Sequence, residues 1–271
     1  MYTVFSGSRE WRTSDHRESV RAQLRLLDPD EDVVIQGAAP GLDSIAAWEA
    51  RLMDFEVIDV PADWDGYGDG AGSIRNGWMR DMLVRARDWG AEVMVYAFHD
   101  DPGLGRGTRD MVRKAREAGI STRLIGEGLC PNPDAITACF IPARDGRMLL
   151  QHRTEDAPVH PGEHGLFGGS LEPEESPGEA LAREAREELG IEVPEGATYL
   201  GPHLFQLPDR TMEMHPWTWR TDLEEDELRS GQREGQGLGF RSYADLYRMI
   251  VPPQDLCVLR TVRQELRRTG W

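Results

Sequence analysis

The sequence predicts an α/β protein of two domains, and three observations carry this prediction. Short apolar runs alternate with amphipathic stretches through the first half of the chain. A stretch rich in Gly, Pro and Asn follows at Gly126–Asp134, as in a linker. Beyond it the pattern changes to paired strands with few helices. A chain of 271 residues is long enough for two ordinary domains, so we expect one over residues 1–128 and another over 133–271.

The first domain is expected to be a Rossmann-like, doubly wound parallel sheet. Its expected strands are short and apolar: Tyr2–Phe5, Val33–Ile35, Glu56–Val60, Val93–Phe98 and Thr122–Ile125. Helical patterns lie between them, at about Ser19–Leu27, Leu42–Met53, Ile74–Trp89 and Thr108–Ala118. Strands that alternate with helices predict a parallel sheet covered on both faces, and right-handed crossovers then give the doubly wound arrangement.

The second domain is expected to be a mixed sheet with few helices. Its expected strands are Ile136–Ile141, Met148–Gln151, Tyr199–Leu207 and Met212–Trp219, with a tight turn at Asp145–Gly146. Helices are expected at Pro177–Leu189 and about Gln254–Arg268. The acidic cluster Asp222–Glu227 is expected to be a solvated loop.

The composition limits the possible partners. A formal net charge of −17 opposes non-specific binding to DNA, RNA or anionic membranes, and no apolar run approaches the roughly 20 residues that a membrane helix needs. A small nucleotide stays compatible with this charge, because a divalent cation can neutralise its phosphates. The N-terminal MYTVFSGSRE does not resemble a signal peptide, and Cys130, Cys139 and Cys257 form no CxxC pair. We therefore expect a cytoplasmic protein that acts on a small molecule, and association into a homo-oligomer stays open.

One helix of the second domain has well-specified ends. Ser176 and Glu179 form a capping-box pattern, and Pro177 occupies the first helical position. Gly190 is placed to end the helix in a left-handed conformation. The residues between these signals can therefore be assigned to helical faces.

Three glutamates share one face of this helix. Glu184, Glu187 and Glu188 fall at positions i, i+3 and i+4. Like charges at these spacings destabilise an isolated helix by roughly some tenths of a kcal/mol per pair, and a divalent cation removes that repulsion. Ligands that are all oxygen suit Mg²⁺ or Mn²⁺ rather than Zn²⁺. A solvated acidic face is the ordinary alternative for such a pattern.

The surrounding segment has a longer pattern. Gly169–Ile191 matches G-x5-E-x7-RE-apolar-x-EE-x-G-apolar without a departure. It resembles the Nudix box, and the resemblance covers about half the chain. This resemblance implies a Nudix α/β/α sandwich with a mixed sheet, in which the box forms loop, helix and loop. It also implies a metal held by three side chains and one main-chain carbonyl: Glu184, Glu187, Glu188 and Gly168. Glu184 is a metal ligand or the general base.

The resemblance assigns roles to further residues. Glu175 and Arg183 would pair and hold the loop against the helix, which is a structural role. Arg233-Glu234-Gly235-Gln236 resembles the loop that supplies a distal acidic ligand in MutT-type Nudix enzymes, so Glu234 is the candidate fourth acid for the metal and for catalysis. A glutamate in a Gly-rich loop is otherwise usually just solvated.

The base and the leaving group of the substrate are left open. Pro252-Pro253-Gln254-Asp255 resembles the segment where MutT enzymes hold an Asn that reads an oxidised guanine. Gln254 or Asp255 stands at that place in this sequence. This departure puts oxidised-guanine specificity in doubt.

Three glycine-containing loops follow strands of the first domain. Ser6–Arg9 follows the first strand, Gln36–Asp43 the second, and Gly105–Thr108 follows the fourth and opens a helix. The loops then lie at the carboxyl ends of parallel strands, where doubly wound sheets bind ligands. Glycines let the backbone approach a phosphate and a helix N-terminus supplies N–H donors, although loops contain glycine anyway.

The pieces SGSR, GAAPGLDSIA, GSIRN and GRGTRDM resemble the YspA-like branch of the SLOG superfamily, over most of residues 1–126. SLOG proteins include phosphoribohydrolases that cut the N-glycosidic bond of cytokinin nucleotides, and nucleotide-sensing domains. The hydrolases have a Glu three positions after the Thr of the Gly-rich turn, where this chain has Met111, with Asp110 one residue earlier. The departure favours binding over catalysis. The expected nucleotide-binding residues are Ser8, Arg9, Gly37, Gly41, Asp43, Arg75, Gly105, Gly107, Thr108 and Asp110.

The leading hypothesis is a two-domain nucleotide-processing enzyme. The second domain would use Mg²⁺ or Mn²⁺ to hydrolyse a nucleoside diphosphate linked to another group, such as a nucleoside triphosphate or ADP-ribose. The first domain would bind or process a nucleotide or an ADP-ribose-like ligand, and an N-glycosidase activity there stays open. The alternative is a nucleotide or NAD-metabolite sensor, in which ligand binding to the first domain regulates a partner. A nucleic-acid-binding module is opposed by the charge.

Overall fold

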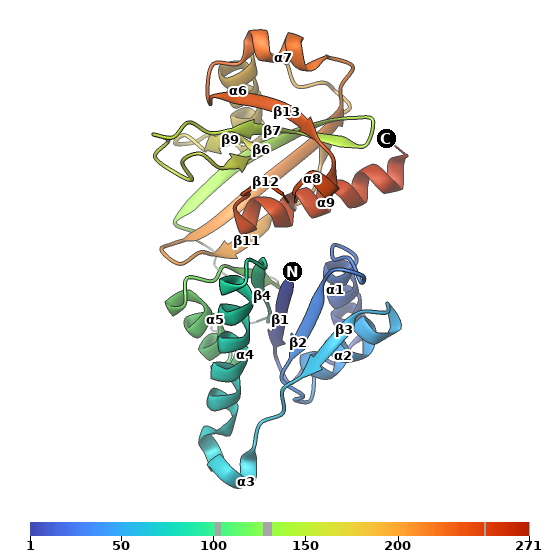
Figure 1. Ribbon diagram of the computed structural model, residues 1–271, viewed down its shortest axis with the longest axis vertical. Coiled ribbons are helices and arrows are strands. Elements are labelled where there is room, and N and C mark those ends of the chain that lie inside the picture. The colour runs from blue at the N-terminus through green and yellow to red at the C-terminus, as the bar shows by residue number, and fades with distance from the viewer. Residues whose placement is uncertain (101–103, 127–131, 247, 271) are drawn as a thin grey trace. The chain divides into compact units, whose positions relative to one another are not determined.

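Figure 1 shows the computed structural model of this chain, which describes residues 1–100, 104–126, 132–246 and 248–270. The chain divides into two compact units. Unit 1 comprises Met1–Asp134 and Leu204–Met212, and unit 2 comprises Ala135–His203 and Glu213–Trp271. The expected domains, residues 1–128 and 133–271, differ from this division mainly because Leu204–Met212 joins the first unit. The expected linker falls largely on residues 127–131, which lie outside the described residues.

Unit 1 is built on a parallel sheet. Its strands are β1 (Tyr2–Gly7), β2 (Val33–Gln36), β3 (Glu56–Asp59), β4 (Val93–Phe98) and β5 (Thr122–Ile125). Their order is β3-β2-β1-β4-β5, and all neighbours in this run are parallel. β11 (His203–Gln206) joins antiparallel to β5, with Phe205 opposite Arg123. This pairing explains why Leu204–Met212 belongs to unit 1.

Helices cover both faces of this sheet, which confirms the doubly wound prediction. The helices are α1 (Ser14–Leu24), α2 (Leu42–Leu52), α4 (Ala71–Asp88) and α5 (Arg106–Glu117). Met79 of α4 and Met111 of α5 share a buried core with Val4 and Val95 on one face. α1 packs on α2, and α2 packs on β1 and β2. The strand order reverses between β1 and β4, and such a reversal opens a crevice at the carboxyl ends of the strands.

Most elements of unit 1 agree with the sequence prediction, and the differences have local causes. α1 begins at Ser14 rather than near Ser19, because Thr13 and His16 form a capping box before it. A short helix α3 (Trp64–Tyr67) and a 3-10 turn η1 (Gly68–Gly70) precede α4 and were not predicted. Asp63 caps α3 by accepting a hydrogen bond from the Gly66 amide.

Unit 2 is built on a mixed sheet. Its strands are β6 (Ala135–Arg144), β7 (Arg147–His152), β8 (His164–Gly165), β9 (Phe167–Ser170), β10 (Thr198–Tyr199), β12 (Thr211–Arg220) and β13 (Gly237–Arg241). The order is β13-β7-β6-β12, with β8 on β7, β9 on β6 and β10 on β12. β7 is antiparallel to both β6 and β13. β6 and β12 run the same way, because hydrogen bonds between them join Thr137 to Glu213 and Ile141 to Thr218.

Helices lie on both sides of the unit 2 sheet. α6 (Pro177–Leu189) packs on β6 and β9, where Ala138 and Phe140 share a buried core with Ala185. The next residue of β6, Cys139, points to the other face. There α9 (Pro253–Thr269) brings Asp255 close to it, and burial together with this carboxylate raises the pKa of the Cys139 thiol. The two helices therefore flank the sheet, which confirms the expected α/β/α arrangement (Figure 1).

Two expectations for unit 2 were wrong. The acidic cluster Asp222–Glu227 is partly helical, because Glu224 and Glu227 form a capping box that starts α7 (Glu225–Gly231). The single expected strand Tyr199–Leu207 is two short strands, β10 and β11, and Gly201 between them has a φ of +79°. A further short helix, α8 (Tyr243–Leu246), was not predicted.

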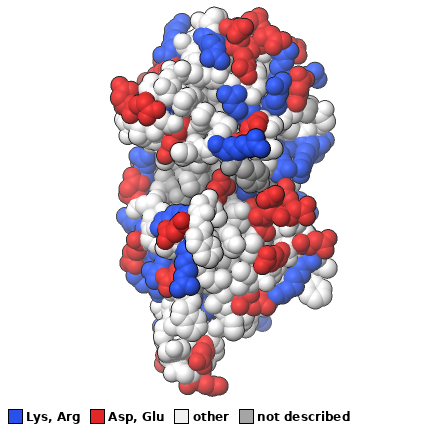
Figure 2. Space-filling view, viewed as in Figure 1, with Lys and Arg blue, Asp and Glu red and all other residues white. Residues whose placement is uncertain are grey.

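Two observations concern the surface and the cysteines. In the described ranges, no helix has the length and apolar character that a membrane crossing requires. On the face drawn in Figure 2, Lys and Arg are interspersed with Asp and Glu rather than gathered in one patch. Cys139 and Cys257 are buried, and Cys130 lies outside the described residues.

A cut between residues 128 and 133 tests the domain boundaries. We expect both fragments to fold, because each unit has its own buried core. The fragment 1–128 loses β11 from the edge of β5, so its melting temperature should fall on the order of 5 °C below that of unit 1 in the intact chain. Calorimetry of both fragments and of the intact chain measures this. Insoluble fragments, or an unchanged melting temperature, would contradict the boundary or the role of β11.

Candidate functional site

Helix α6 has the ends that the sequence predicts. The Ser176 side chain accepts from the Glu179 amide, the Glu179 side chain accepts from the Ser176 amide, and Pro177 is the first helical residue. Gly190 ends the helix with φ 67° and ψ 24°, which is the left-handed region. These ends place Glu184, Glu187 and Glu188 on the expected turns.

One arginine holds the acidic face of α6 together. Arg183 donates to both carboxylate oxygens of Glu175, at 2.9 and 3.0 Å. It also donates to Glu184 Oε1 at 2.7 Å, to Glu187 Oε2 at 3.1 Å and to the Ser170 carbonyl at 3.0 Å. The structure thus brings Glu175 and Arg183 together as expected, and joins Glu184 and Glu187 to the same guanidinium. The loop Ser170–Glu175 is thereby tied to the helix.

Glu188 is the most buried of the three glutamates Glu184, Glu187 and Glu188. Its side chain reaches the sheet, where Oε2 accepts a 2.7 Å hydrogen bond from the Gly168 amide. Burial raises the pKa of Glu188 to about 8, and the nearby carboxylates of Glu184 and Glu234 act in the same direction. The carboxyl group therefore holds its proton at neutral pH unless a cation replaces that proton.

Two glycines of β9 make room for these carboxylates. Gly168 has φ +122°, and a Cβ there would lie 2.1 Å from the Ala138 carbonyl oxygen. A Cβ at Gly169 would lie 2.3 Å from Glu184 Oε1. Any larger residue at either position would displace the neighbouring strand or the carboxylate.

The distal acid Glu234 is brought to the helix by its loop. The loop follows α7 and is fixed by two hydrogen bonds, from the Arg233 amide to the Glu188 carbonyl at 2.9 Å and from the Gln236 amide to the His152 carbonyl at 2.8 Å. The Glu234 carboxylate is near enough to raise the pKa values of Glu184 and Glu188. Glu234, far from the box in sequence, therefore lies at the same site.

The donor chemistry of the site fits a hard divalent cation. The hydrogen bonds described above use Oε1 of Glu184, Oε2 of Glu187 and Oε2 of Glu188, which leaves the second oxygen of each carboxylate for a cation. Oxygen ligands favour Mg²⁺ or Mn²⁺, and such a cation would displace the proton of Glu188 on binding. Among the residues with a described position, however, no three acidic, His or Cys side chains converge closely enough to hold a metal. Arg183 binds Glu184 and Glu187 there.

Sequence analysis missed one cationic residue at this site. Arg153 follows β7 and acts electrostatically on both Glu188 and Asp255. Its Nε is buried and has no hydrogen-bond partner in the structure. The only signal in the sequence was the position of an arginine at the end of a predicted strand. Gln254 and Asp255 are buried, Gln254 beside His160 and Asp255 accepting from the Leu166 amide.

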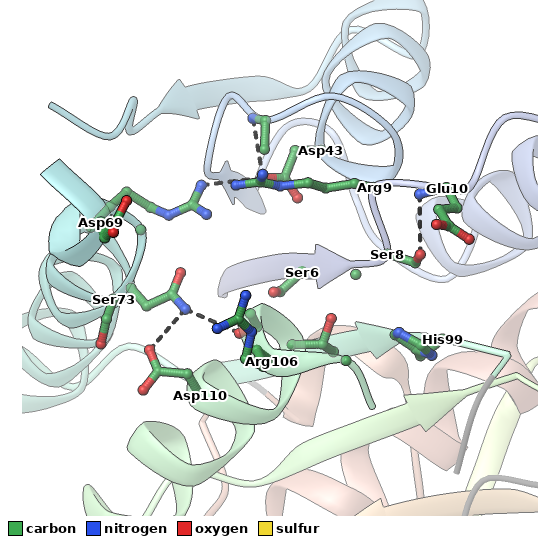
Figure 3. Close-up of a pocket in the computed structure, with 18 of the residues that line it drawn as sticks. Ser6, Ser8, Arg9, Glu10, Asp43, Asp69, Ser73, His99, Arg106 and Asp110 are labelled. Atoms are coloured by element: carbon green, nitrogen blue, oxygen red, sulfur yellow. Dashed lines mark hydrogen bonds and ion pairs between the residues drawn. The ribbon is translucent and has the colours of Figure 1, made fainter. Parts of the chain in front are cut away.

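Unit 1 contains a second candidate site. A cavity of about 820 Å³ opens at the carboxyl ends of β1 and β4, where the strand order reverses. Side chains from the loops after both strands and from α4 and α5 face it (Figure 3). Eight of the expected nucleotide-binding residues line it: Ser8, Arg9, Asp43, Arg75, Gly105, Gly107, Thr108 and Asp110. Lining residues that the sequence analysis did not select include Trp64, Asp69, Asn76, His99 and Arg106.

Gly37 and Gly41 do not line the cavity, which corrects that expectation. A Cβ at Gly37 would fall 1.2 Å from Arg75 Nη1, so the arginine occupies the space over this glycine. Gly41 has φ +86°, and a Cβ there would meet the Arg9 main chain at 2.5 Å. Both glycines therefore make room for the cavity's arginines rather than for a ligand.

Buried polar groups surround this cavity. Arg75 donates to Asp43 at 3.2 Å. The pKa of Asp43 is nevertheless raised, because the effect of burial exceeds the opposing effect of Arg75. Asn76 donates to the Gly107 carbonyl at 3.1 Å and to Asp110 at 3.0 Å. Two atoms here are buried without a hydrogen-bond partner in the structure, namely Arg75 Nε and Asn76 Oδ1.

Asp110 is held by several donors. Lys114 donates to its Oδ2 at 2.6 Å and Arg113 to its Oδ1 at 2.8 Å. Partial burial raises the pKa of Asp110, but hydrogen bonds from Lys114, Arg113 and Asn76 outweigh it, so the pKa is lowered. Asp110 is therefore a carboxylate with both oxygens engaged.

Comparisons with known proteins concern the C-terminal half of the chain. The family model of the NUDIX domain matches residues 131–265. The chain is similar to the CTP pyrophosphohydrolase of Escherichia coli (strain K12), with 42% identity over 77 residues, covering 27% of this chain and 53% of that protein. It is also similar to the nucleoside triphosphatase NudI of Escherichia coli O1:K1 / APEC, with 33% identity over 96 residues, covering 35% and 57%. The chain thus spans about half the length of the curated relatives it matches.

Solved structures similar to this half include two of low sequence identity. One is the MutT protein from Methanosarcina mazei Go1, with 22% identity, 49% of this chain and 94% of that chain covered, and a TM-score of 0.40. Another is the NUDIX domain of Shewanella oneidensis NrtR complexed with ADP ribose, with 18% identity, coverage of 49% and 88%, and a TM-score of 0.39. With the family match and the curated relatives, the sequence pattern of α6 identifies residues 131–265 as a NUDIX domain.

Proposed function

We propose that this chain is a Mg²⁺-dependent hydrolase that cleaves the P–O–P bridge of a nucleoside diphosphate derivative. The observation that supports this proposal is the shared face of α6, on which Glu184, Glu187 and Glu188 each keep one carboxylate oxygen outside the hydrogen bonds described above, with the Glu234 carboxylate near enough to act on Glu184 and Glu188. Mn²⁺ has the same ligand preference and is the alternative cation. Because the curated relatives are named as a CTP pyrophosphohydrolase and a nucleoside triphosphatase, nucleoside triphosphates are the first substrate class to test, before ADP-ribose.

The metal would be held by the α6 glutamates, Glu234 and the Gly168 carbonyl. When bound, a divalent cation lowers the pKa of water and offsets negative charge on the phosphoryl oxygens. Arg183 positions Glu184 and Glu187 on the face where they are needed, and Glu184 is the candidate for accepting a proton from water. Arg153 has a buried, unpartnered Nε that is suited to donate to a phosphoryl oxygen.

We further propose that the cavity of unit 1 binds a nucleotide or an ADP-ribose-like ligand. Its place at the switch point of a doubly wound sheet, its arginines and the N-terminus of α5 support this proposal. Because both oxygens of Asp110 are engaged, the contacts favour binding over N-glycosidic hydrolysis. The departure from the SLOG hydrolase pattern, with Met111 in place of a Glu, points the same way. The second candidate function, a sensor in which this binding regulates a partner, rests on the same cavity.

The first test concerns the metal. Full-length protein incubated with Mg²⁺ and a panel of nucleoside triphosphates and ADP-ribose should release a nucleoside monophosphate, identified by mass spectrometry, and EDTA should stop the release. Glu187→Gln should reduce turnover at least about a hundredfold, the order expected when a metal-site group is lost. Glu192→Gln, in an exposed side chain paired only with Arg186 among the ion pairs described, is the matched control. Full activity in EDTA would exclude the proposed mechanism.

A second test separates the structural and the catalytic roles in the box. Arg183→Ala removes every contact of the guanidinium and leaves Glu175 and Glu184 without their cation, so both the melting temperature and the Mg²⁺ affinity should fall. Glu187 is mostly exposed, so Glu187→Gln should abolish turnover with a nearly unchanged melting temperature. Differential scanning calorimetry and Mg²⁺ titration distinguish the two. Equal melting temperatures for both variants would show that the roles are assigned wrongly.

The third test uses the raised pKa of Glu188. In the unfolded chain this group releases its proton near its ordinary pKa of 4.5, whereas in the folded metal-free chain it keeps the proton up to about pH 8. The unfolded state thus binds fewer protons in this window, so the free energy of unfolding in EDTA should fall between about pH 4.5 and 8, by at most about 1.4 kcal/mol per pH unit for one proton. Urea unfolding at several pH values measures it. Glu188→Gln should remove this component, and identical pH profiles for the two proteins would contradict it.

A further inference from the structure

We propose that the cavity of unit 1 selects a ligand with a planar aromatic ring, and that this ring stacks on Trp64. The inference rests on the proposed binding function of unit 1 and adds the feature of the ligand that is recognised. It assigns the ring to Trp64 and an anionic group to the start of α5, both of which line the cavity.

Trp64 is an exposed aromatic side chain in a cavity wall. It belongs to the four-residue helix α3, lines the cavity and is 50% exposed. The Arg9 guanidinium carbon lies over its ring, 5.7 Å from the centroid. Gly72 of α4 lies on another side, since a Cβ there would be in ordinary contact with the ring at 3.6 Å. A large exposed indole that is positioned by two neighbours offers a stacking surface to a ligand ring.

Arg9 makes this surface selective for planar groups. A guanidinium is planar and stacks on aromatic faces, so Arg9 can fold over a ring that rests on Trp64. Arg9 is also long and flexible, and Figure 3 shows its side chain extended along the cavity. A sugar phosphate without a base would leave both groups in contact with water.

Buried atoms without partners indicate where the rest of the ligand binds. Arg75 and Asn76 are 8% and 2% exposed and both line the cavity. Arg75 Nε is an unused donor and Asn76 Oδ1 an unused acceptor, and buried polar groups are normally paired. A ligand with both acceptor oxygens and hydroxyl or amino donors would satisfy them.

The start of α5 suits the anionic group. The helix begins after Gly105, with no side-chain hydrogen bond at its cap and no acidic residue in its first turn. A Cβ at Gly107 would meet nothing within 4 Å, so the space over this residue is open. Arg106 faces the cavity beside it (Figure 3). The amides, the open space and the guanidinium together favour an anion at this end.

The test compares a ligand that has a base with a ligand that lacks it. Full-length protein in EDTA is titrated with AMP and with ribose 5-phosphate by calorimetry. The wild type should bind AMP at least about tenfold more tightly, which corresponds to about 1.4 kcal/mol and is within the range for base–aromatic stacking. Trp64→Ala should reduce this preference to within about threefold, while Trp64→Phe should keep most of it because the ring is retained.

Two control variants make the outcomes distinct. Trp89→Ala removes a tryptophan of the same unit that is 85% exposed and lies outside the cavity lining, and it should behave as wild type. Arg75→Ala should weaken both ligands together, which localises binding to this cavity. A tenfold preference that persists in Trp64→Ala would overturn the role of Trp64. No binding of either ligand to wild type, or no effect of Arg75→Ala, would instead overturn the proposed binding function of unit 1, and this inference with it.

Discussion

The contact between Arg183 and the carboxylates of α6 is the interaction on which the site of unit 2 depends. Like charges at the spacings of Glu184, Glu187 and Glu188 repel, and one guanidinium binds two of them while it also binds Glu175. The same side chain reaches the Ser170 carbonyl, so it fixes the loop before the helix to the helix itself. Without that link, the loop Ser170–Glu175 would lose its contacts with the start of the acidic face of α6.

Glu188 shows why the proposed metal would stabilise this site. Its carboxyl group is buried between helix and sheet, close to two other carboxylates, and it bonds the Gly168 amide. Burying a charge that has no cation beside it is costly, so in the metal-free protein the group takes up a proton instead. A divalent cation would offset the charge of several carboxylates at once, so that none of them needs a proton. The acidity that opposes binding of polyanions over most of the chain is thus an advantage at this one place.

The cavity of unit 1 also contains buried charged groups, but arginines rather than glutamates would bind its ligand. It lies where the strand order reverses, so loops from β1 and β4 and the start of α5 all open on it. Its cations are arginines, and Gly37 provides the space that the Arg75 guanidinium occupies. The main-chain amides at the N-terminus of α5 add partial positive charge. Recognition here would depend on shape and stacking, whereas the site of unit 2 is organised around charge.

The sequence by itself determined the parallel strands of unit 1, the strands β6, β7 and β12 of unit 2, the helix Pro177–Leu189 with its caps, and the acidic face of that helix, because these follow from local periodicity and capping chemistry. Other features needed the tertiary structure. α7 overlaps the acidic cluster Asp222–Glu227, and Leu228 is its one buried residue, so no apolar periodicity marks it. β9 has two glycines and becomes a strand by pairing with β6. The sequence could not indicate a role for Arg153, Trp64 or Asn76, because a single residue forms no sequence motif. Only packing decides which of them is buried without a partner, exposed in a cavity, or close to a residue distant in sequence.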